Sequence, residues 1–253
     1  MLAVSSDLTA EQRLNKAVIA IMGHPLYVAL AGILMVGTRE VRDDVPTACT
    51  NGRDEYYGRA FIDSLTDAQL RFVVLHECYH KMYKHLTTWQ HLWLRCAMTA
   101  NKAMDYVINI QILDAHRDDK FVVGIDGMCY DTKYRDWDTA RVFADIYNSS
   151  SNPSESDDSQ GNESGEDGGQ PSPSSQQSDQ QPFDEHDWAG AQEMTDEEQK
   201  ELGKEIDDAI RQGAITAGKL GTGGERTVAD LLEPQVDWRE VLREFITDTC
   251  TGS

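Results

Sequence analysis

Leu75-His76-Glu77-Cys78-Tyr79-His80 is the most informative segment of this chain. Residues four apart lie on the same face of an α-helix, so the imidazoles of His76 and His80 can reach one metal ion. Glu77 would then lie beside the open position of the metal, where its carboxylate can act as a general base for a water molecule. This HExxH pattern is typical of zinc-dependent peptidases and predicts Glu77 as the catalytic residue.

The residues before the motif predict that it lies inside a buried helix. Thr66 and Gln69 form a capping box, which marks a helix start, and Asp67 places a negative charge where the helix dipole favours one. Between Leu70 and Leu75 nearly every residue is apolar, as expected of a helix surrounded by core. We therefore expect a helix from about residue 67 to residue 85, with the motif two to three turns from its start.

Apolar periodicity and turn signals predict the elements of the remaining chain. A turn at residues 50–53 leads into a strand-like segment, and residues 121–123 could form a second short strand. Two helices are expected between residues 7 and 37, with a break near residues 23–25. Three further helices are expected at residues 93–114, 137–147 and 195–214. These elements predict an α+β fold that is mostly helical, with a small sheet beside the motif helix.

The charge of the chain is concentrated in one segment. The formal net charge of the 253 residues is −21, and residues 151–200 carry 14 Asp or Glu and one Lys, a net of −13, which leaves −8 for the remainder. The acidic balance argues against a nucleic-acid partner. Residues 148–187 are rich in Ser, Gln, Gly, Asp and Pro, which predicts a disordered linker between a domain at residues 7–147 and a helical segment at residues 188–253.

Neither the cysteines nor the apolar segments indicate secretion or membrane insertion. The five cysteines form no CxxC pair, and their odd number favours reduced thiols. The apolar run from Leu26 to Val36 is too short to span a bilayer and follows an acidic, amphipathic start. We therefore expect a cytoplasmic protein with no membrane partner.

A catalytic zinc takes three protein ligands, so a third must be found beyond His76 and His80. Asp105 is the first candidate, because it follows His80 by 25 residues on the next expected helix, and an antiparallel helix can bring its carboxylate opposite the motif. Asn101, Asp105 and Asn109 share one face of that otherwise apolar helix. Such a polar stripe either faces a metal with supporting amides or meets solvent.

His85 is the alternative third ligand. In a continuous helix it points about 140° away from His80, so it could bind the metal only if the helix ends or bends there. Otherwise His85 is a structural histidine. His116 is a more distant candidate, whereas His91 and His24 are expected at the surface and in a turn.

Four motifs in order resemble one known family. They are the segment Val45-Pro46-Thr47-Ala48-Cys49-Thr50-Asn51-Gly52, the HExxH motif followed by His85-Leu86, the segment Ala103-Met104-Asp105-Tyr106-Val107-Ile108-Asn109, and the segment Val236-Asp237-Trp238-Arg239-Glu240-Val241-Leu242-Arg243-Glu244-Phe245. In this order they are similar to the metallopeptidase-like domain that precedes a von Willebrand factor A-like domain in bacterial and phage proteins.

The resemblance implies a zincin-like fold and a metal site, and it implies proteolysis less strongly. The von Willebrand-like domain should begin just after Phe245, whereas the chain ends at Ser253, so we expect that module to be absent here. The resemblance also implies partners, namely an AAA+ ATPase or a separate protein with a von Willebrand A-like domain.

Together these patterns predict a zinc metallopeptidase that acts on a peptide or protein substrate. His76, His80 and Asp105 would bind Zn²⁺, with His85 as the alternate, and Glu77 would take a proton from the attacking water. The alternative is a non-catalytic interaction protein. In it the metal would only stabilise the fold, and the linker and C-terminal helix would recruit a partner. A closed four-ligand site using both His85 and Asp105 would favour this alternative, and an open three-ligand site would favour the enzyme.

Overall fold

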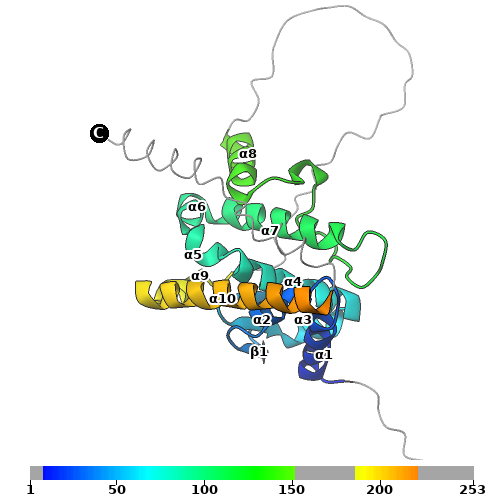
Figure 1. Ribbon diagram of the computed structural model, residues 1–253. Coiled ribbons are helices and arrows are strands. Elements are labelled where there is room, and N and C mark those ends of the chain that lie inside the picture. The colour runs from blue at the N-terminus through cyan, green and yellow to red at the C-terminus, as the bar shows by residue number, and fades with distance from the viewer. Residues whose placement is uncertain (1–7, 152–185, 222–253) are drawn as a thin grey trace, which may run out of the picture.

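The computed structural model describes residues 8–151 and 186–221, which form a mainly helical α+β fold (Figure 1). The α-helices are α1 (Ala10–Met22), α2 (Ala31–Leu34), α3 (Arg59–Ser64), α4 (Asp67–Met82), α5 (His85–Thr88), α6 (Gln90–Arg95), α7 (Ala97–Asp114), α8 (Thr139–Ser151), α9 (Trp188–Glu193) and α10 (Asp196–Leu220). Two short 3₁₀ helices are η1 (Val28–Leu30) and η2 (Thr132–Tyr134). The expected α+β fold with a predominance of helix is therefore confirmed.

The sheet has three strands in the order β1-β3-β2. β1 (Arg39–Arg42) runs parallel to β3 (Glu55–Gly58), and β2 (Ala48–Thr50) runs antiparallel to β3 with Thr50 opposite Glu55. The turn between β2 and β3 forms because the Asn51 side chain accepts hydrogen bonds from the backbone N–H groups of Arg53 and Asp54. Gly52 has a φ of 94°, which a residue with a side chain rarely adopts.

Helix α4 lies at the centre of the fold and carries the HExxH motif. Its capping box forms as expected, with the Thr66 side chain accepting from the Gln69 backbone N–H. From Phe72 to His80 each residue is at most 3 % exposed, because α1, α2, α7 and β2 pack around the helix. The prediction that the motif lies in a buried helix is therefore confirmed.

Helix α10 covers one side of α4 and lies across α2 and η1, as Figure 1 shows. The packing is close because two glycines face backbone atoms. A Cβ on Gly213 would lie 1.8 Å from the Ala29 carbonyl oxygen, and one on Gly32 would lie 2.8 Å from the Ala209 oxygen. The segment after the linker thus contributes to the same core as the N-terminal helices.

The structure corrects three expectations about local structure. Residues 121–123 form no strand, because the Phe121 carbonyl accepts from the Arg71 side chain and the Val123 N–H donates to the Ala68 carbonyl, both on α4. The helix expected at residues 93–114 is interrupted at Cys96, whose backbone is extended. Strand β1 was not expected from the sequence. Of the linker expected at residues 148–187, residues 148–151 belong to α8 and residues 186–187 lie directly before α9. Residues 152–185 and the VDWR segment lie outside the described residues.

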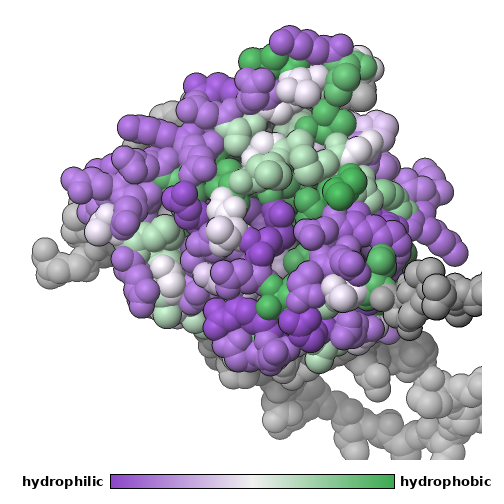
Figure 2. All heavy atoms as spheres, turned by 90° about the horizontal axis from the view of Figure 1, so that it is seen from below, coloured by the Kyte–Doolittle hydropathy of each residue, from purple (hydrophilic) through white to green (hydrophobic). Residues whose placement is uncertain are grey.

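One face of the molecule is covered mainly by hydrophilic residues, with hydrophobic residues gathered in a smaller area toward the upper part of the view (Figure 2). Among the described residues, no helix is both long enough and apolar enough to cross a membrane.

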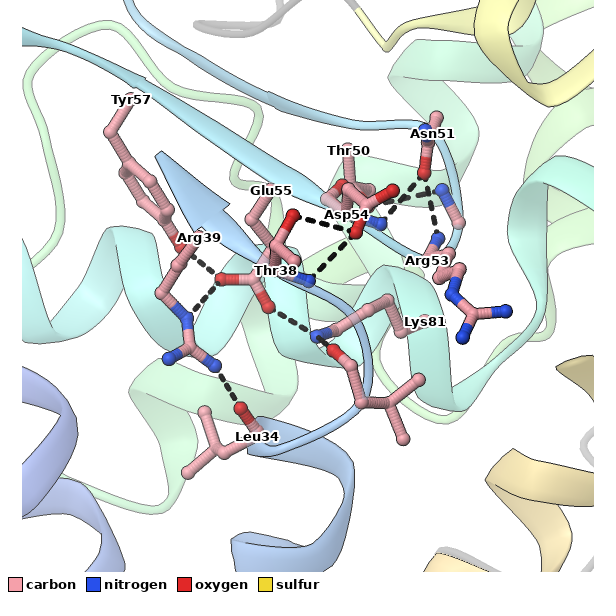
Figure 3. Close-up of polar contacts among 12 residues, drawn as sticks. Leu34, Thr38, Arg39, Thr50, Asn51, Arg53, Asp54, Glu55, Tyr57 and Lys81 are labelled. Atoms are coloured by element: carbon pink, nitrogen blue, oxygen red, sulfur yellow. Dashed lines mark hydrogen bonds and ion pairs between the residues drawn. The ribbon is translucent and has the colours of Figure 1, made fainter. Parts of the chain in front are cut away.

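A buried ion pair fixes α4 against the sheet (Figure 3). Lys81 and Glu55 have fully buried side chains that pair with each other, and Lys81 also donates to the Val36 carbonyl at 3.0 Å. The second carboxylate oxygen of Glu55 accepts from Arg39 Nε at 2.8 Å and from the Tyr57 hydroxyl at 2.7 Å. Burial raises the pKa of Glu55, but the charges of Lys81 and Arg39 outweigh burial, so its pKa lies below the ordinary value.

We predict that Lys81→Met destabilises the fold by about 3–5 kcal/mol, because it leaves the Glu55 carboxylate buried without its principal cation. Lys84→Met is the control, since Lys84 and its partner Asp207 have side chains that are 26 % and 47 % exposed. That variant should lose less than about 1 kcal/mol. Urea unfolding at neutral pH measures both values, and equal losses would contradict the role given to Lys81.

Candidate metal centre

Helices α4 and α7 bring His76, His80 and Asp105 together. The three side chains offer ligand atoms that all lie within 4.8 Å of one another, and all three are fully buried. The Nε2 atoms of the two histidines are 2.9 Å apart, and Asp105 Oδ1 lies 3.6 Å from His76 Nε2 and 3.5 Å from His80 Nε2. The helical spacing of four and the packing of α7 against α4 create this cluster.

The size and chemistry of the cluster fit a zinc ion. Ligands held about 2.0–2.1 Å from one tetrahedral ion lie roughly 3.3 Å from each other, which is close to the three distances between these donor atoms. Two imidazole nitrogens and one carboxylate oxygen are also a donor set that zinc accepts. His76, His80 and Asp105 could therefore hold the metal.

Asn109 orients His76 and sets its tautomer. The Asn109 side-chain N–H donates to the Cys129 carbonyl at 3.0 Å, so its oxygen must face His76 Nδ1, which lies 2.8 Å away. His76 Nδ1–H is then the donor of that hydrogen bond. A neutral imidazole protonated at Nδ1 has its lone pair at Nε2, the atom that faces His80 and Asp105.

His85 lies behind His80 and away from Asp105. Helix α4 ends at Met82, Lys84 adopts a left-handed backbone with a φ of 53°, and α5 begins at His85, so the helix does end where the alternative ligand required it to. His85 Nδ1 nevertheless contacts the far nitrogen of the His80 ring, Nδ1, at 2.9 Å. The contact suits a residue that orients His80.

Burial keeps His80 and His85 neutral. Desolvation, with the adjacent imidazole of His186 as the next cause, holds the pKa of both His80 and His85 well below the ordinary value. Neutral imidazole is the form that binds a metal, so the burial of the cluster favours coordination as well as packing.

Glu77 is fully buried and lies between the two motif histidines in the sequence, directly after His76. The pKa of Tyr57 on β3 is raised well above its ordinary value by burial, by Glu55 and also by the charge of Glu77. Glu77 therefore lies within electrostatic range of the sheet.

The stripe of Asn101, Asp105 and Asn109 faces the interior. Asp105 and Asn109 are fully buried, and Asn101 accepts a hydrogen bond at 3.1 Å from the indole N–H of Trp188. The stripe thus meets α4 and α9. The alternative prediction, that the stripe meets solvent, is wrong for Asp105 and Asn109.

His186 is the residue of the site that the sequence analysis missed. Its Nε2 lies 3.9 Å from Asp105 Oδ1, its ring centroid is 4.0 Å from that of His80, and only 6 % of it is exposed. It falls near the end of the segment expected to be a disordered linker, which is why it was not considered. The one local signal was its position beside Trp188, where the polar tract ends.

The remaining histidines lie elsewhere. His116 belongs to a second group with His24 and Asp119, in which both ring nitrogens of His116 are already hydrogen-bonded, to the Tyr27 hydroxyl at 2.6 Å and to Asp119 at 2.8 Å. These bonds account for that group without a metal. His91 is exposed and stacks on Trp89.

Comparisons with known proteins identify the family of this chain. No curated protein and no solved structure matches it. A family model described as a putative metallopeptidase domain matches residues 9–252, which is nearly the whole chain and includes the HExxH helix and Asp105. The chain therefore belongs to this metallopeptidase-like domain family.

Proposed function

We propose that this chain is a zinc-dependent peptidase in which His76, His80 and Asp105 hold the metal. The observation that carries the proposal is the convergence of two Nε2 atoms and one carboxylate oxygen in a fully buried cluster on the HExxH helix. Membership of the family supports a metal-dependent hydrolase, and the donor set favours zinc.

The bound ion would supply Lewis-acid chemistry, polarising the substrate carbonyl and lowering the pKa of water. Glu77 would accept a proton from the attacking water at its carboxylate and deliver it to the amide nitrogen of the leaving group. Asn109 would keep the lone pair of His76 on Nε2, and His85 would hold the ring of His80 from behind. Burial of these side chains would keep bulk water away from the reacting bond.

The position of His85 favours the enzyme over a purely structural metal site. A closed structural site would use both Asp105 and His85 as ligands. His85 instead contacts the nitrogen of His80 that faces away from Asp105, which argues against His85 as a fourth ligand. The AAA+ ATPase and von Willebrand-type partners remain predictions from the family resemblance.

We predict that the purified chain binds about one zinc ion and that His76→Ala abolishes binding. Asp105→Ala should weaken zinc affinity more than His85→Ala, because Asp105 offers an oxygen to the centre and His85 acts through His80. Competition with a chromophoric chelator measures both affinities. The reverse order would transfer the role of third ligand to His85.

Asn109→Leu should weaken zinc affinity by about 10- to 100-fold, because the hydrogen bond that selects the tautomer of His76 is lost. Gln111→Leu is the matched control on the same helix, since Gln111 bonds the Tyr83 hydroxyl and does not contact the centre. The same chelator assay applies, with circular dichroism to verify folding. Equal affinities in the two variants would refute the orienting role of Asn109.

Glu77→Gln tests the catalytic step, because it keeps the size of the side chain and removes the base. The variant should retain its zinc and lose peptide hydrolysis by at least ~100-fold. Hydrolysis is measured on a diverse peptide library with and without chelator. Activity that survives unchanged in Glu77→Gln would rule out this mechanism, and a wild type without zinc-dependent hydrolysis would favour the interaction protein.

A further inference from the structure

The outer edge of β2 carries backbone groups that point away from the sheet. The Gly58 N–H donates to the Thr47 carbonyl, and the Asn51 N–H donates to the Asp54 carbonyl, so residues 47 and 51 face β3. Because alternate residues of an antiparallel strand direct their polar groups to opposite sides, Ala48 and Thr50 face outward. β2 is also an edge strand of the described sheet.

The chain itself occupies this edge. The backbone N–H of Asp187 donates to the outward carbonyl of Thr50 at 3.1 Å. The preceding residue, His186, lies against His80 and Asp105. The following residue, Trp188, stacks on Trp93 with ring centroids 5.1 Å apart.

Residues 186–188, here called the strap, turn at Asp187, where the Trp188 N–H donates to the His186 carbonyl at 2.9 Å, and make one main-chain bond to the edge strand. Peptides that bind an edge strand pair through the main chain, and their side chains enter pockets on either side. The strap presents one main-chain donor to β2, one side chain to the metal-binding residues and one aromatic side chain to an apolar cluster that includes Trp89, Leu92 and Ala100.

The strap also closes the centre. His76, Glu77, His80 and Asp105 are fully buried, and His186 and Trp188 are only 6 % and 5 % exposed. His186 lies against His80 and Asp105, so a polypeptide cannot reach these two residues from that side while the strap is in place. If the centre acts on peptides, the strap has to leave before a substrate binds.

We propose that the outer edge of β2 is a binding surface for a polypeptide segment, and that the strap occupies it as an internal pseudosubstrate. This inference rests on the proposed peptidase function. The ligand is a segment that donates a main-chain hydrogen bond to the Thr50 carbonyl and places a large aromatic side chain where Trp188 lies. The free chain is accordingly latent, and its apparent affinity for substrate is reduced by the fraction of molecules in which the strap is bound.

The main-chain hydrogen bond can be removed by one substitution. Asp187 has a φ of −78°, which proline adopts without strain, so Asp187→Pro deletes the N–H that reaches Thr50. Asp187→Ala is the matched control. In both variants the side chain at position 187 can no longer accept the hydrogen bond from the Gly190 N–H at the start of α9. Only the proline variant also lacks the backbone N–H that donates to the Thr50 carbonyl.

The binding assay uses the full-length, zinc-loaded chain carrying Glu77→Gln, so that no probe is hydrolysed. The probe is a fluorescent peptide with the sequence of residues 184–190, and a second probe has alanine in place of the tryptophan. Anisotropy should show that Asp187→Pro binds the first probe at least about fivefold more tightly than Asp187→Ala, the scale of one net hydrogen bond. The alanine probe should bind more weakly to both variants.

Equal affinities of the two variants for the first probe would overturn the inference. If Asp187→Pro does not fold, Trp188→Ala replaces it, because loss of the aromatic anchor should release the strap in the same direction. With Glu77 intact, released variants should hydrolyse peptides faster than Asp187→Ala. Tighter binding of the probe without any zinc-dependent hydrolysis would support the binding surface on β2 and refute the proposed peptidase function. The experiment therefore distinguishes failure of this inference from failure of the proposed function.

Discussion

The pairing of Lys81 with Glu55 is the interaction on which the orientation of the central helix depends. An ammonium group that is fully buried must meet a carboxylate, and the partners of Lys81 lie on β3 and in the segment before β1. Lys81 directly follows His80, and successive helical residues are about 100° apart. When Lys81 faces the sheet, His80 and His76 are turned toward α7, which carries Asp105. One ion pair therefore couples the sheet to the proposed metal-binding face of α4.

The burial that this packing imposes also favours the neutral form of His80 and His85. Burial lowers the pKa of His80 and of His85 and so holds both imidazoles neutral, and a neutral imidazole is the form that binds a metal. Polar groups in a buried cluster need partners, and Asn109 and His85 supply them on the sides that face away from Asp105. The orientation of the proposed ligands is thus a consequence of satisfying buried hydrogen bonds.

Local patterns predicted the parts of the site that lie on single helices. The capping box at Thr66 and the spacing of the motif follow from helix geometry alone, and the polar stripe on α7 indicates Asp105 as a buried polar residue. Strand β1 could not be predicted in this way, because none of its four residues is fully buried and Arg39 is partly buried where it pairs with Glu55 on β3. The position of His186 depends on a contact across more than one hundred residues, and no local pattern encodes such a contact.

A centre that is sealed in the resting chain can open only if the part that closes it is less stable than the rest. Helix α9 has six residues, too few to be stable alone, and the described contacts that hold it are chiefly those of Trp188 and one main-chain bond from Asp187. Helix α10, in contrast, packs backbone to backbone on Ala29 through Gly213. The strap can therefore detach as a local event while α4, α7 and α10 keep the proposed ligands in place, which is how a buried site could admit a substrate without unfolding.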